Sequence, residues 1–283
     1  MPGWLIHLAF AYLVSKLLKI RDISLVLIGA ILPDVSRVLA VLNFFNLSAK
    51  TYYVYLSPLH SPFLVIILAI AMSLLFRKPL KSFLYLSLGF ITHFFLDQLQ
   101  SAYSTGKLLL YPFSYLAFSQ LNLFWADSKY MILFMIISFI ILIYAVFDKN
   151  KKPVKITTKR VFLVILLILF YLILPVLTFN TFMEKDPYIQ QFERNNTELL
   201  IAYAVIKSED PIILSEMDYE YQITNQINVK KGDWISAKAE FQNNKITIKE
   251  YYKHNRLLKE GASALALLAL IIIIIKNPKR YKP

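Results

Sequence analysis

The stretch Gly89-Phe90-Ile91-Thr92-His93-Phe94-Phe95-Leu96-Asp97 is almost wholly apolar, yet it carries a histidine and a carboxylate four residues apart. Residues i and i+4 share one face of a helix, so His93 and Asp97 are expected to point the same way. The segment is hydrophobic enough to span a bilayer, where an ionisable group is costly and is by default a candidate functional group. The pair therefore predicts half of a site. The alternative is a lone ion pair or a helix-packing contact.

The composition indicates an integral membrane protein, because 57% of the 283 residues are hydrophobic and 15% are aromatic. The net charge is +13, but the lysines and arginines cluster beside apolar runs, as in positive-inside anchoring. We therefore expect no nucleic-acid partner. The chain has no cysteine, so any metal must be held by nitrogen and oxygen ligands. The N-terminus lacks the features of a cleaved signal peptide, so the first apolar run is expected to stay in the mature protein.

Apolar runs long enough, or nearly long enough, to cross a bilayer recur along the chain. They lie at residues 4–18, 23–42, 59–76, 82–99, 129–147, 161–179 and 261–275. The first and the last are short or interrupted, so each can instead lie at the membrane interface. The sequence predicts a mainly α-helical, polytopic transmembrane bundle of about six or seven helices.

The distribution of charge in the connecting segments predicts the orientation in the membrane. Basic residues lie between the first two runs, between the third and fourth, at 148–160 and after residue 275. These segments are expected to be cytoplasmic. The segments 43–58 and 100–128 carry few cations, and together with residues 180–260 they are expected on the outer side of the cell (plasma) membrane.

Residues 180–260 are polar and patterned with a period of two, which predicts a small β-rich extramembrane domain. Residues 234–241 and 245–252 alternate across a short turn and predict a hairpin, and residues 199–206 and 211–214 can supply further strands. The fourth histidine, His254, is expected at the surface of this domain.

The chain thus divides into four parts. Residues 1–128 form a membrane metal-site core of four helices and an outer loop, and residues 129–179 form two further transmembrane helices. Residues 180–260 form the β-rich domain. Residues 261–283 form a C-terminal transmembrane helix and a basic tail.

Five ionisable residues are predicted at similar depth, near the outer ends of the first four helices. The charge bias that places them there does not use the residues themselves, so the agreement predicts a shared site. They are His7, Asp34, His60, His93 and Asp97.

Three imidazoles and two carboxylates without a thiolate suit Zn²⁺ best, with Mn²⁺ or Fe²⁺ as alternatives. Such a site with an open position supports hydrolysis. We expect His7, Asp34, His60 and His93 to bind the metal, and Asp97 to ligate it or to act as general base toward water. Asp34 and Asp97 are the candidate catalytic residues. The alternative is a buried hydrogen-bonded cluster that holds the four helices together.

The order of motifs resembles the membrane-bound metal-dependent hydrolase family related to the LexA-regulated inner-membrane protein. The similarity covers about residues 1–115 and implies a hydrolase whose metal ligands are these His and Asp residues. The matching motifs are His7-Leu8-Ala9-Phe10, Leu32-Pro33-Asp34-Val35-Ser36, Leu59-His60-Ser61, His93-Phe94-Phe95-Leu96-Asp97 and Leu109-Leu110-Tyr111-Pro112-Phe113.

The chain departs from the family pattern at three positions. Ser36 stands where the family has a second Asp, and Tyr55 and Leu56 stand where it has a His and an Arg. Two potential ligands and a phosphate-binding cation are therefore missing, which weakens a two-metal mechanism and leaves an inactive relative as an alternative. Arg37 can replace that cation, but we interpret it as an interfacial snorkelling residue.

The leading hypothesis is a membrane-embedded metal-dependent hydrolase acting near the outer leaflet on a lipid or other amphiphile, at a phosphoester. A lipid head group reaches that depth by lateral diffusion, so membrane lipid is the expected partner and substrate. A non-enzymatic metal-binding or transport protein is the first alternative, but a carrier needs polar groups through both membrane halves. An adaptor that presents residues 180–260 and carries a vestigial site is the second.

Overall fold

The computed structural model describes residues 3–35, 48–101, 103–125, 128–148, 157–193, 197–242 and 245–275. Within these ranges it contains ten α-helices, one 3₁₀ helix and five β-strands. This confirms a mainly helical chain with a small β-domain. The helices are α1 (Trp4–Leu17), α2 (Ile23–Ile31), η1 (Leu32–Asp34), α4 (Ala49–Leu59), α5 (Pro62–Leu74), α6 (Pro79–Leu99), α7 (Lys129–Phe147), α8 (Val161–Leu177), α9 (Phe179–Lys185), α10 (Pro187–Glu193) and α11 (Arg256–Ile275).

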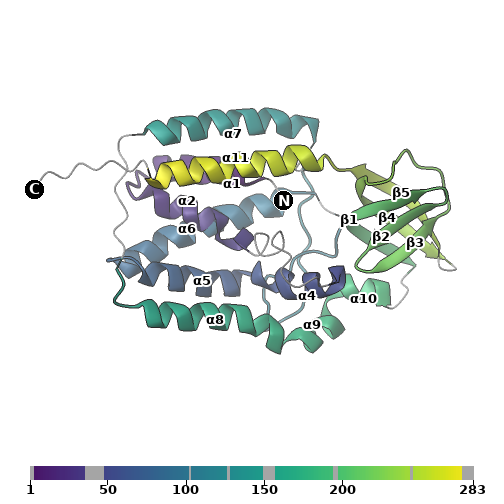
Figure 1. The fold of residues 1–283 in the computed structure, drawn as a ribbon, viewed down its shortest axis with the longest axis horizontal. Helices are drawn as coiled ribbons and strands as arrows, with labels where there is room; N and C mark the ends of the chain where they lie inside the picture. Colours follow the sequence, from purple (N-terminus) through teal and green to yellow (C-terminus); the bar gives the residue numbers. More distant parts are fainter. Residues whose placement is uncertain are drawn as a thin grey trace, which may run out of the picture.

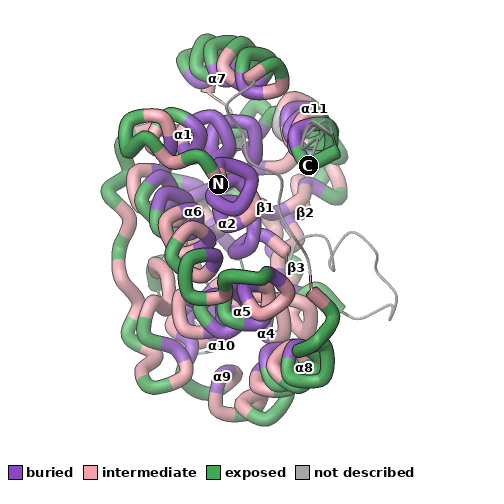
Figure 2. The backbone as a smooth tube through the Cα atoms, turned by 90° about the vertical axis from the view of Figure 1, so that its left-hand side faces the viewer, coloured by how far each residue is buried: buried purple, intermediate pink, exposed green. Residues whose placement is uncertain are grey.

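The long helices run side by side, with α2 and α6 in the middle (Figure 1). Helices α1, α7 and α11 lie on one side of this pair, and α5 and α8 lie on the other. Burial is concentrated at the centre, whereas α7 and α8 are largely exposed (Figure 2). Their exposed residues are apolar, as Leu133 on α7 and Phe162 on α8 show. An apolar outer surface of this kind is suited to contact with lipid tails.

The central helices α2 and α6 cross at two glycines with almost no space between their backbones. A Cβ atom added to Gly29 would lie 2.1 Å from the carbonyl oxygen of Leu86. A Cβ atom added to Gly89 would lie 2.1 Å from the carbonyl oxygen of Val26. Only glycine permits so close an approach, which brings the end of α2 beside the last turns of α6.

Helix α2 is shorter than the predicted helix 23–42, since its α-helical part ends at Ile31 and η1 follows. Pro33 lacks a main-chain N–H and disfavours a continuous α-helix at this point. The remainder of the predicted helix, from residue 36 to residue 42, lies outside the described residues.

The expectation that residues 43–58 form a loop is wrong for its described part, because α4 occupies Ala49–Leu59. Helix α4 then meets α5 at a bend of 63°. Pro62 at the start of α5 has no N–H to continue α4, and it holds Ser61 in an extended conformation. The break leaves His60 between the two helices, at the C-cap of α4.

By length and composition, two described helices can each cross a membrane, at Pro79–Leu99 and Tyr130–Phe147. Two bent pairs, α4 with α5 and α8 with α9, raise the number to four if each pair forms one span. Three shorter apolar helices correspond to the predicted runs at 4–18, 23–42 and 261–275. The protein therefore has several candidate spans, fewer than the seven runs counted in the sequence.

The basic connections between α1 and α2 and between α5 and α6 lie at the end of the bundle away from the β-domain (Figure 1). Lys16, in the last turn of α1, forms an ion pair of 3.1 Å with Asp148 after α7. Lys81 of α6 forms one of 2.8 Å with Asp22 before α2. These contacts join the ends of α1 and α7 and the starts of α2 and α6.

The β-domain is a closed barrel with the strand order β1-β2-β3-β5-β4. The β4–β5 hairpin is the one predicted from the sequence, whereas β3 was not predicted. Five strands in this order, with β3 and β5 parallel, form a small Greek-key barrel of the OB type. The strands are β1 (Glu198–Glu209), β2 (Ile212–Glu216), β3 (Tyr219–Ile223), β4 (Trp234–Gln242) and β5 (Lys245–Lys253).

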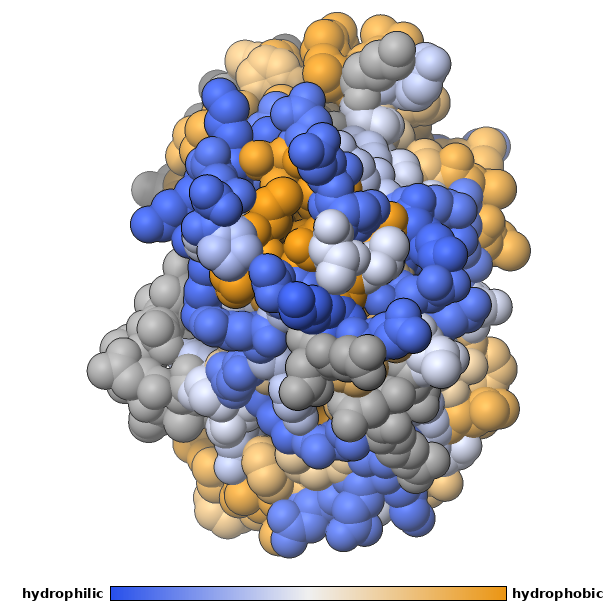
Figure 3. Space-filling view, turned by 90° about the vertical axis from the view of Figure 1, so that its right-hand side faces the viewer, coloured by the Kyte–Doolittle hydropathy of each residue, from blue (hydrophilic) through white to orange (hydrophobic). Residues whose placement is uncertain are grey.

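The barrel contacts α10, α4 and the loop between α6 and α7. In the turn between β2 and β3, the Asp218 carboxylate accepts hydrogen bonds from the main-chain N–H groups of Ala49 (3.0 Å) and Lys50 (3.2 Å). A residue of the barrel therefore caps α4. On another side, the ring of Trp125 stacks on Tyr252 at 4.4 Å. Figure 3 views the molecule from the barrel end, where the surface is mainly hydrophilic around a small hydrophobic area.

The expectation that His254 lies at the surface is wrong. Its side chain is buried, its Nε2 atom lies 2.8 Å from Ser236 Oγ, and its ring stacks on Tyr203. The residue follows β5 directly, so the closing of the barrel onto the Trp125 loop covers it.

Candidate metal centre

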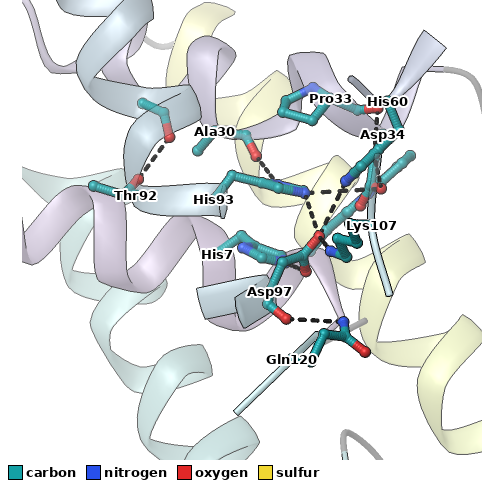
Figure 4. Close-up of polar contacts among 12 residues, drawn as sticks. His7, Ala30, Pro33, Asp34, His60, Thr92, His93, Asp97, Lys107 and Gln120 are labelled. Carbon is teal, nitrogen blue, oxygen red and sulfur yellow. Dashed lines mark hydrogen bonds and ion pairs between the residues drawn. The ribbon is translucent and has the colours of Figure 1, made fainter. Parts of the chain in front are cut away.

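The structure brings all five candidate residues together at the barrel end of the helical bundle (Figure 4). His7 lies near the start of α1, Asp34 ends η1, and His60 occupies the break between α4 and α5. His93 and Asp97 lie near the end of α6. The close crossing of α2 and α6 and the bend before α5 are the two local features that allow this meeting.

The distances between their ligand atoms suit a shared metal ion. His93 Nε2 lies 3.4 Å from Asp97 Oδ2 and 3.9 Å from Asp34 Oδ1. His60 Nε2 lies 3.0 Å from Asp97 Oδ2, and His7 Nε2 lies 3.5 Å from Asp97 Oδ1. Two ligands of a tetrahedral zinc ion, each about 2.1 Å from it, are about 3.4 Å apart.

Two of the histidines have their tautomer fixed by the main chain. His60 Nδ1 donates a hydrogen bond to the carbonyl oxygen of Pro33, and His93 Nδ1 donates one to that of Ala30, both at 2.8 Å. Ala30 lies in the last turn of α2, where carbonyl groups lack a partner within the helix. In the neutral ring each Nε2 atom then carries a lone pair, which faces carboxylate oxygens. A cation between these atoms removes the repulsion, and a hydrogen bond from Nδ1 to a carbonyl is the usual support of a metal-bound histidine.

His7 is fully buried, and neither of its ring nitrogens has a hydrogen-bond partner among the described residues. Its ring stacks on His93 at 3.9 Å. A buried polar atom without a partner costs free energy, and a bound ion would supply that partner. These observations fit the residues to a metal.

Two groups of three residues can each hold an ion: His7, Asp34 and His93, or His60, His93 and Asp97. Both groups need His93, whose Nδ1 atom already donates to Ala30. Only Nε2 remains, and it can bind one ion. The geometry therefore favours a single ion whose ligands come from both groups. One of the two carboxylates would then lie beside the ion without binding it.

Three further residues contact the site and were not identified from the sequence. Trp4 Nε1 donates a hydrogen bond of 2.8 Å to Asp34 Oδ2, and Gln120 Nε2 donates one of 3.2 Å to the main-chain oxygen of Asp97. Lys107 Nζ lies 2.6 Å from Asp97 Oδ2. Trp4 stands three residues before His7, which is helix spacing and could have served as a signal.

The positions at which the chain departs from the family pattern do not add ligands. Tyr55 packs against Phe179, and Leu56 packs against the hydrophobic core. Ser36 and Arg37 lie outside the described residues.

A helical bundle with candidate membrane spans and a buried cluster of three histidines and two aspartates defines the class: a membrane protein with a site that can hold a metal ion. The chain belongs to the YdjM inner membrane protein family, which matches residues 1–182. The resemblance to LexA-regulated inner-membrane metal-dependent hydrolases, read from the motifs, is confirmed by this match.

The match covers the whole site and ends in α9, so the barrel lies beyond the matched part. No curated protein and no solved structure matches the chain.

Proposed function

We propose that the protein is a membrane-embedded, metal-dependent hydrolase that acts on a lipid or another amphiphile, at a phosphoester bond. The metal, zinc by preference, is held by His7, Asp34, His60, His93 and Asp97. The observation that carries this proposal is the pair of Nε2 lone pairs, on His60 and His93, that face the Asp97 carboxylate at 3.0 and 3.4 Å. A cation bound between these atoms would remove the repulsion between the lone pairs, and nitrogen and oxygen donors without sulfur suit a divalent ion of the zinc type.

A divalent ion at this site would supply a Lewis acid and would lower the pKa of water beside it. The main-chain carbonyls of Pro33 and Ala30 hold the rings of His60 and His93 in position. Trp4 occupies one oxygen of Asp34 and leaves the other toward the histidines. Asp97 has the position of a general base, because its carboxylate lies at the centre of the cluster.

The surroundings of the site support a lipid substrate. The site lies near the end of α6, a candidate membrane span whose Ile91 and Phe95 side chains are exposed. An amphiphile that diffuses in the bilayer can meet such a surface with its tails in the membrane. A large soluble substrate would have to approach from the aqueous side, past the barrel and the loop between α6 and α7.

A transport function has less support. The charged residues of the site form one cluster (Figure 4), near the start of α1 and the end of α6. Elsewhere in the described long helices the buried polar side chains are Thr92 and serines, such as Ser15, Ser24, Ser73 and Ser82. A translocation path needs charged or strongly polar groups through both halves of the membrane.

The test combines metal analysis of the purified full-length protein with hydrolysis of vesicle-borne phosphate esters and carboxylic esters. We expect about one divalent ion per chain and turnover of a phosphate ester that a chelator abolishes. Asp97→Asn should abolish turnover, because an amide is not a base. Stoichiometric metal without hydrolysis of any ester would favour the metal-binding alternative, and absence of metal would favour an adaptor.

A further inference from the structure

Lys107 is a charged residue at the site that comes from a loop and not from a helix. It is the one lysine or arginine between residues 100 and 128. Its Nζ atom lies 2.6 Å from Asp97 Oδ2, so the loop between α6 and α7 brings a positive charge directly to the site.

The main chain of Lys107 is held in place. Its N–H donates to the carbonyl oxygen of Phe118, and its own carbonyl oxygen accepts from the Phe118 N–H, both at 2.9 Å. The preceding Gly106 has φ +113°, and an added Cβ atom there would lie 2.5 Å from the Phe118 oxygen. The turn therefore fixes where the side chain starts, whereas its four-carbon stem remains free to reorient.

The same loop covers the end of α6. The N–H groups of Leu121 and Leu123 donate to the carbonyl oxygens of Gln98 (2.8 Å) and Leu99 (2.9 Å). At the two ends of the loop, Tyr103 donates a hydrogen bond to Glu250 and Trp125 stacks on Tyr252. The contacts of the loop with α6 and with the barrel together hold Lys107 beside the site.

The site is accessible on the side of Lys107. The side chains of Lys107 and His60 are 17% and 12% exposed, whereas those of His7, Asp34, His93 and Asp97 are fully buried. A molecule that approaches these six residues therefore meets Lys107 and His60 first.

We propose that Lys107 binds an oxyanion of the substrate, the phosphoryl oxygens of a phosphate ester, and that its ion pair with Asp97 is the substrate-free arrangement. This inference rests on the proposed function. Two carboxylates balance the charge of a divalent ion, so Lys107 leaves one positive charge that an anionic group neutralises. An ammonium group with three donors is suited to phosphate oxygens.

The contacts of Asp97 Oδ2 explain why the ion pair between Lys107 and Asp97 can open. This one oxygen faces the Lys107 ammonium at 2.6 Å, His60 Nε2 at 3.0 Å and His93 Nε2 at 3.4 Å. A metal held by the two histidines would compete with Lys107 for the same oxygen and would weaken the ion pair. A substrate oxyanion could then draw the ammonium toward the exposed side. If Lys107 were only the counter-ion of a buried carboxylate, its removal would leave Asp97 unpaired and would weaken the whole site.

The test uses full-length protein in a phosphate-free detergent. Binding of radiolabelled inorganic phosphate is measured by equilibrium dialysis with and without Mn²⁺, for wild type, Lys107→Gln, Lys107→Arg and the control Lys185→Gln. Lys185 is exposed near the same loop and contacts the ring of Tyr115, not the site. We expect Lys107→Gln to keep its Mn²⁺ and its thermal unfolding temperature and to lose phosphate affinity by about tenfold or more. Lys107→Arg should retain part of the affinity, and Lys185→Gln all of it.

Equal phosphate affinity in wild type and Lys107→Gln would overturn the inference, and so would loss of Mn²⁺ from Lys107→Gln. A wild-type protein that binds neither Mn²⁺ nor Zn²⁺ would overturn the proposed function instead, and the dialysis without metal would then decide on Lys107 by the same comparison. Competition by a short-chain phosphatidic acid separates two sources of the oxyanion. Displacement tighter than that by phosphate indicates a lipid head group, and equal displacement indicates free phosphate; both support the oxyanion site.

Discussion

His93 and His254 are both buried, but their surroundings indicate different roles for the two side chains. His93 Nε2 faces two carboxylates, whereas His254 Nε2 faces the Ser236 hydroxyl and its ring stacks on Tyr203. We expect His93→Ala to lose metal while the protein still inserts, because removal of a polar group lowers the cost of insertion. His254→Ala should keep its metal and unfold at a lower temperature. Metal content and thermal unfolding measured side by side give the answer, and unchanged metal in His93→Ala would contradict the site.

The five residues that meet at the site could be identified from the sequence because an ionisable group is rare in an apolar helix. The signal is the contrast between His93 or Asp97 and its neighbours. Lys107 gave no such signal, since a lysine in a loop between helices is ordinary. His254 was misjudged for the same reason, because its burial depends on how Trp125 meets the barrel. The sequence around His254 does not predict the contact between Trp125 and the barrel.

At the scale of the elements, the crossing of α2 and α6 decides whether the ligands meet. We expect Gly89→Ala to destabilise the protein and to lower its metal affinity, since the added methyl group forces α6 away from Val26 and Asp34 away from His93. Gly261→Ala is the matched control, because the space around Gly261 in α11 is open. It should stabilise the protein by up to about 1 kcal/mol. Thermal unfolding and metal binding are the measurements, and equal behaviour of the two variants would refute the account.

Element boundaries were predictable where a local rule sets them. The β4–β5 hairpin follows from the alternation of its residues, and Pro33 marks the end of α2. Helix α4 was missed because a search for apolar runs passes over a polar, aromatic helix. The bend that follows it depends on the packing of α4 against α8 and α9 as well as on Pro62.

The joint between α10 and the barrel contains a group that responds to pH. Burial raises the pKa of Glu216 to about 8, although its carboxylate accepts a hydrogen bond from the Tyr188 hydroxyl. A raised pKa in the folded state means that folding favours the protonated acid. Stability is therefore greatest below the unfolded pKa of about 4.5 and falls as the pH rises toward about 8.

We expect Glu216→Gln to remove most of this pH dependence and to raise the unfolding temperature at about pH 8.5, because the amide stays neutral. Glu220→Gln, an exposed position on β3, is the control and should keep the wild-type slope. Unfolding temperatures of the full-length protein between about pH 5 and about pH 8.5 test this. A slope that persists in Glu216→Gln would exclude Glu216 as its source.

For the whole molecule, the basic connections between α1 and α2 and between α5 and α6 lie at the end of the bundle opposite the barrel (Figure 1). The positive-inside rule then predicts that the barrel and the site face the outer side. The chain has no cysteine, so single cysteines can report this without background. Lys231→Cys on the barrel should react with an impermeant thiol reagent in intact cells, and Lys78→Cys only after permeabilisation. The reverse pattern would invert the orientation.

The short helices around the site bear on the shape of the bilayer itself. Helix α1 has 14 residues and α5 has 13, which gives each a length of about 20 Å at 1.5 Å per residue. The hydrocarbon core of a typical bilayer is about 30 Å thick. If α1, which exposes Leu13 and Leu17, spans the bilayer, the lipids beside it would have to compress to match its length.

Such a hydrophobic mismatch would draw lipid head groups down toward the plane of His60 and Lys107. We expect hydrolysis to be fastest in vesicles of short-chain lipids and to slow as the acyl chains lengthen, whereas metal content stays constant. A hydrolysis rate that does not depend on acyl-chain length would mean that the substrate leaves the bilayer to reach the site. Membrane thinning would then play no part in bringing them together. Local thinning of the membrane would let an enzyme buried in the bilayer act on a bond that normally lies at its surface.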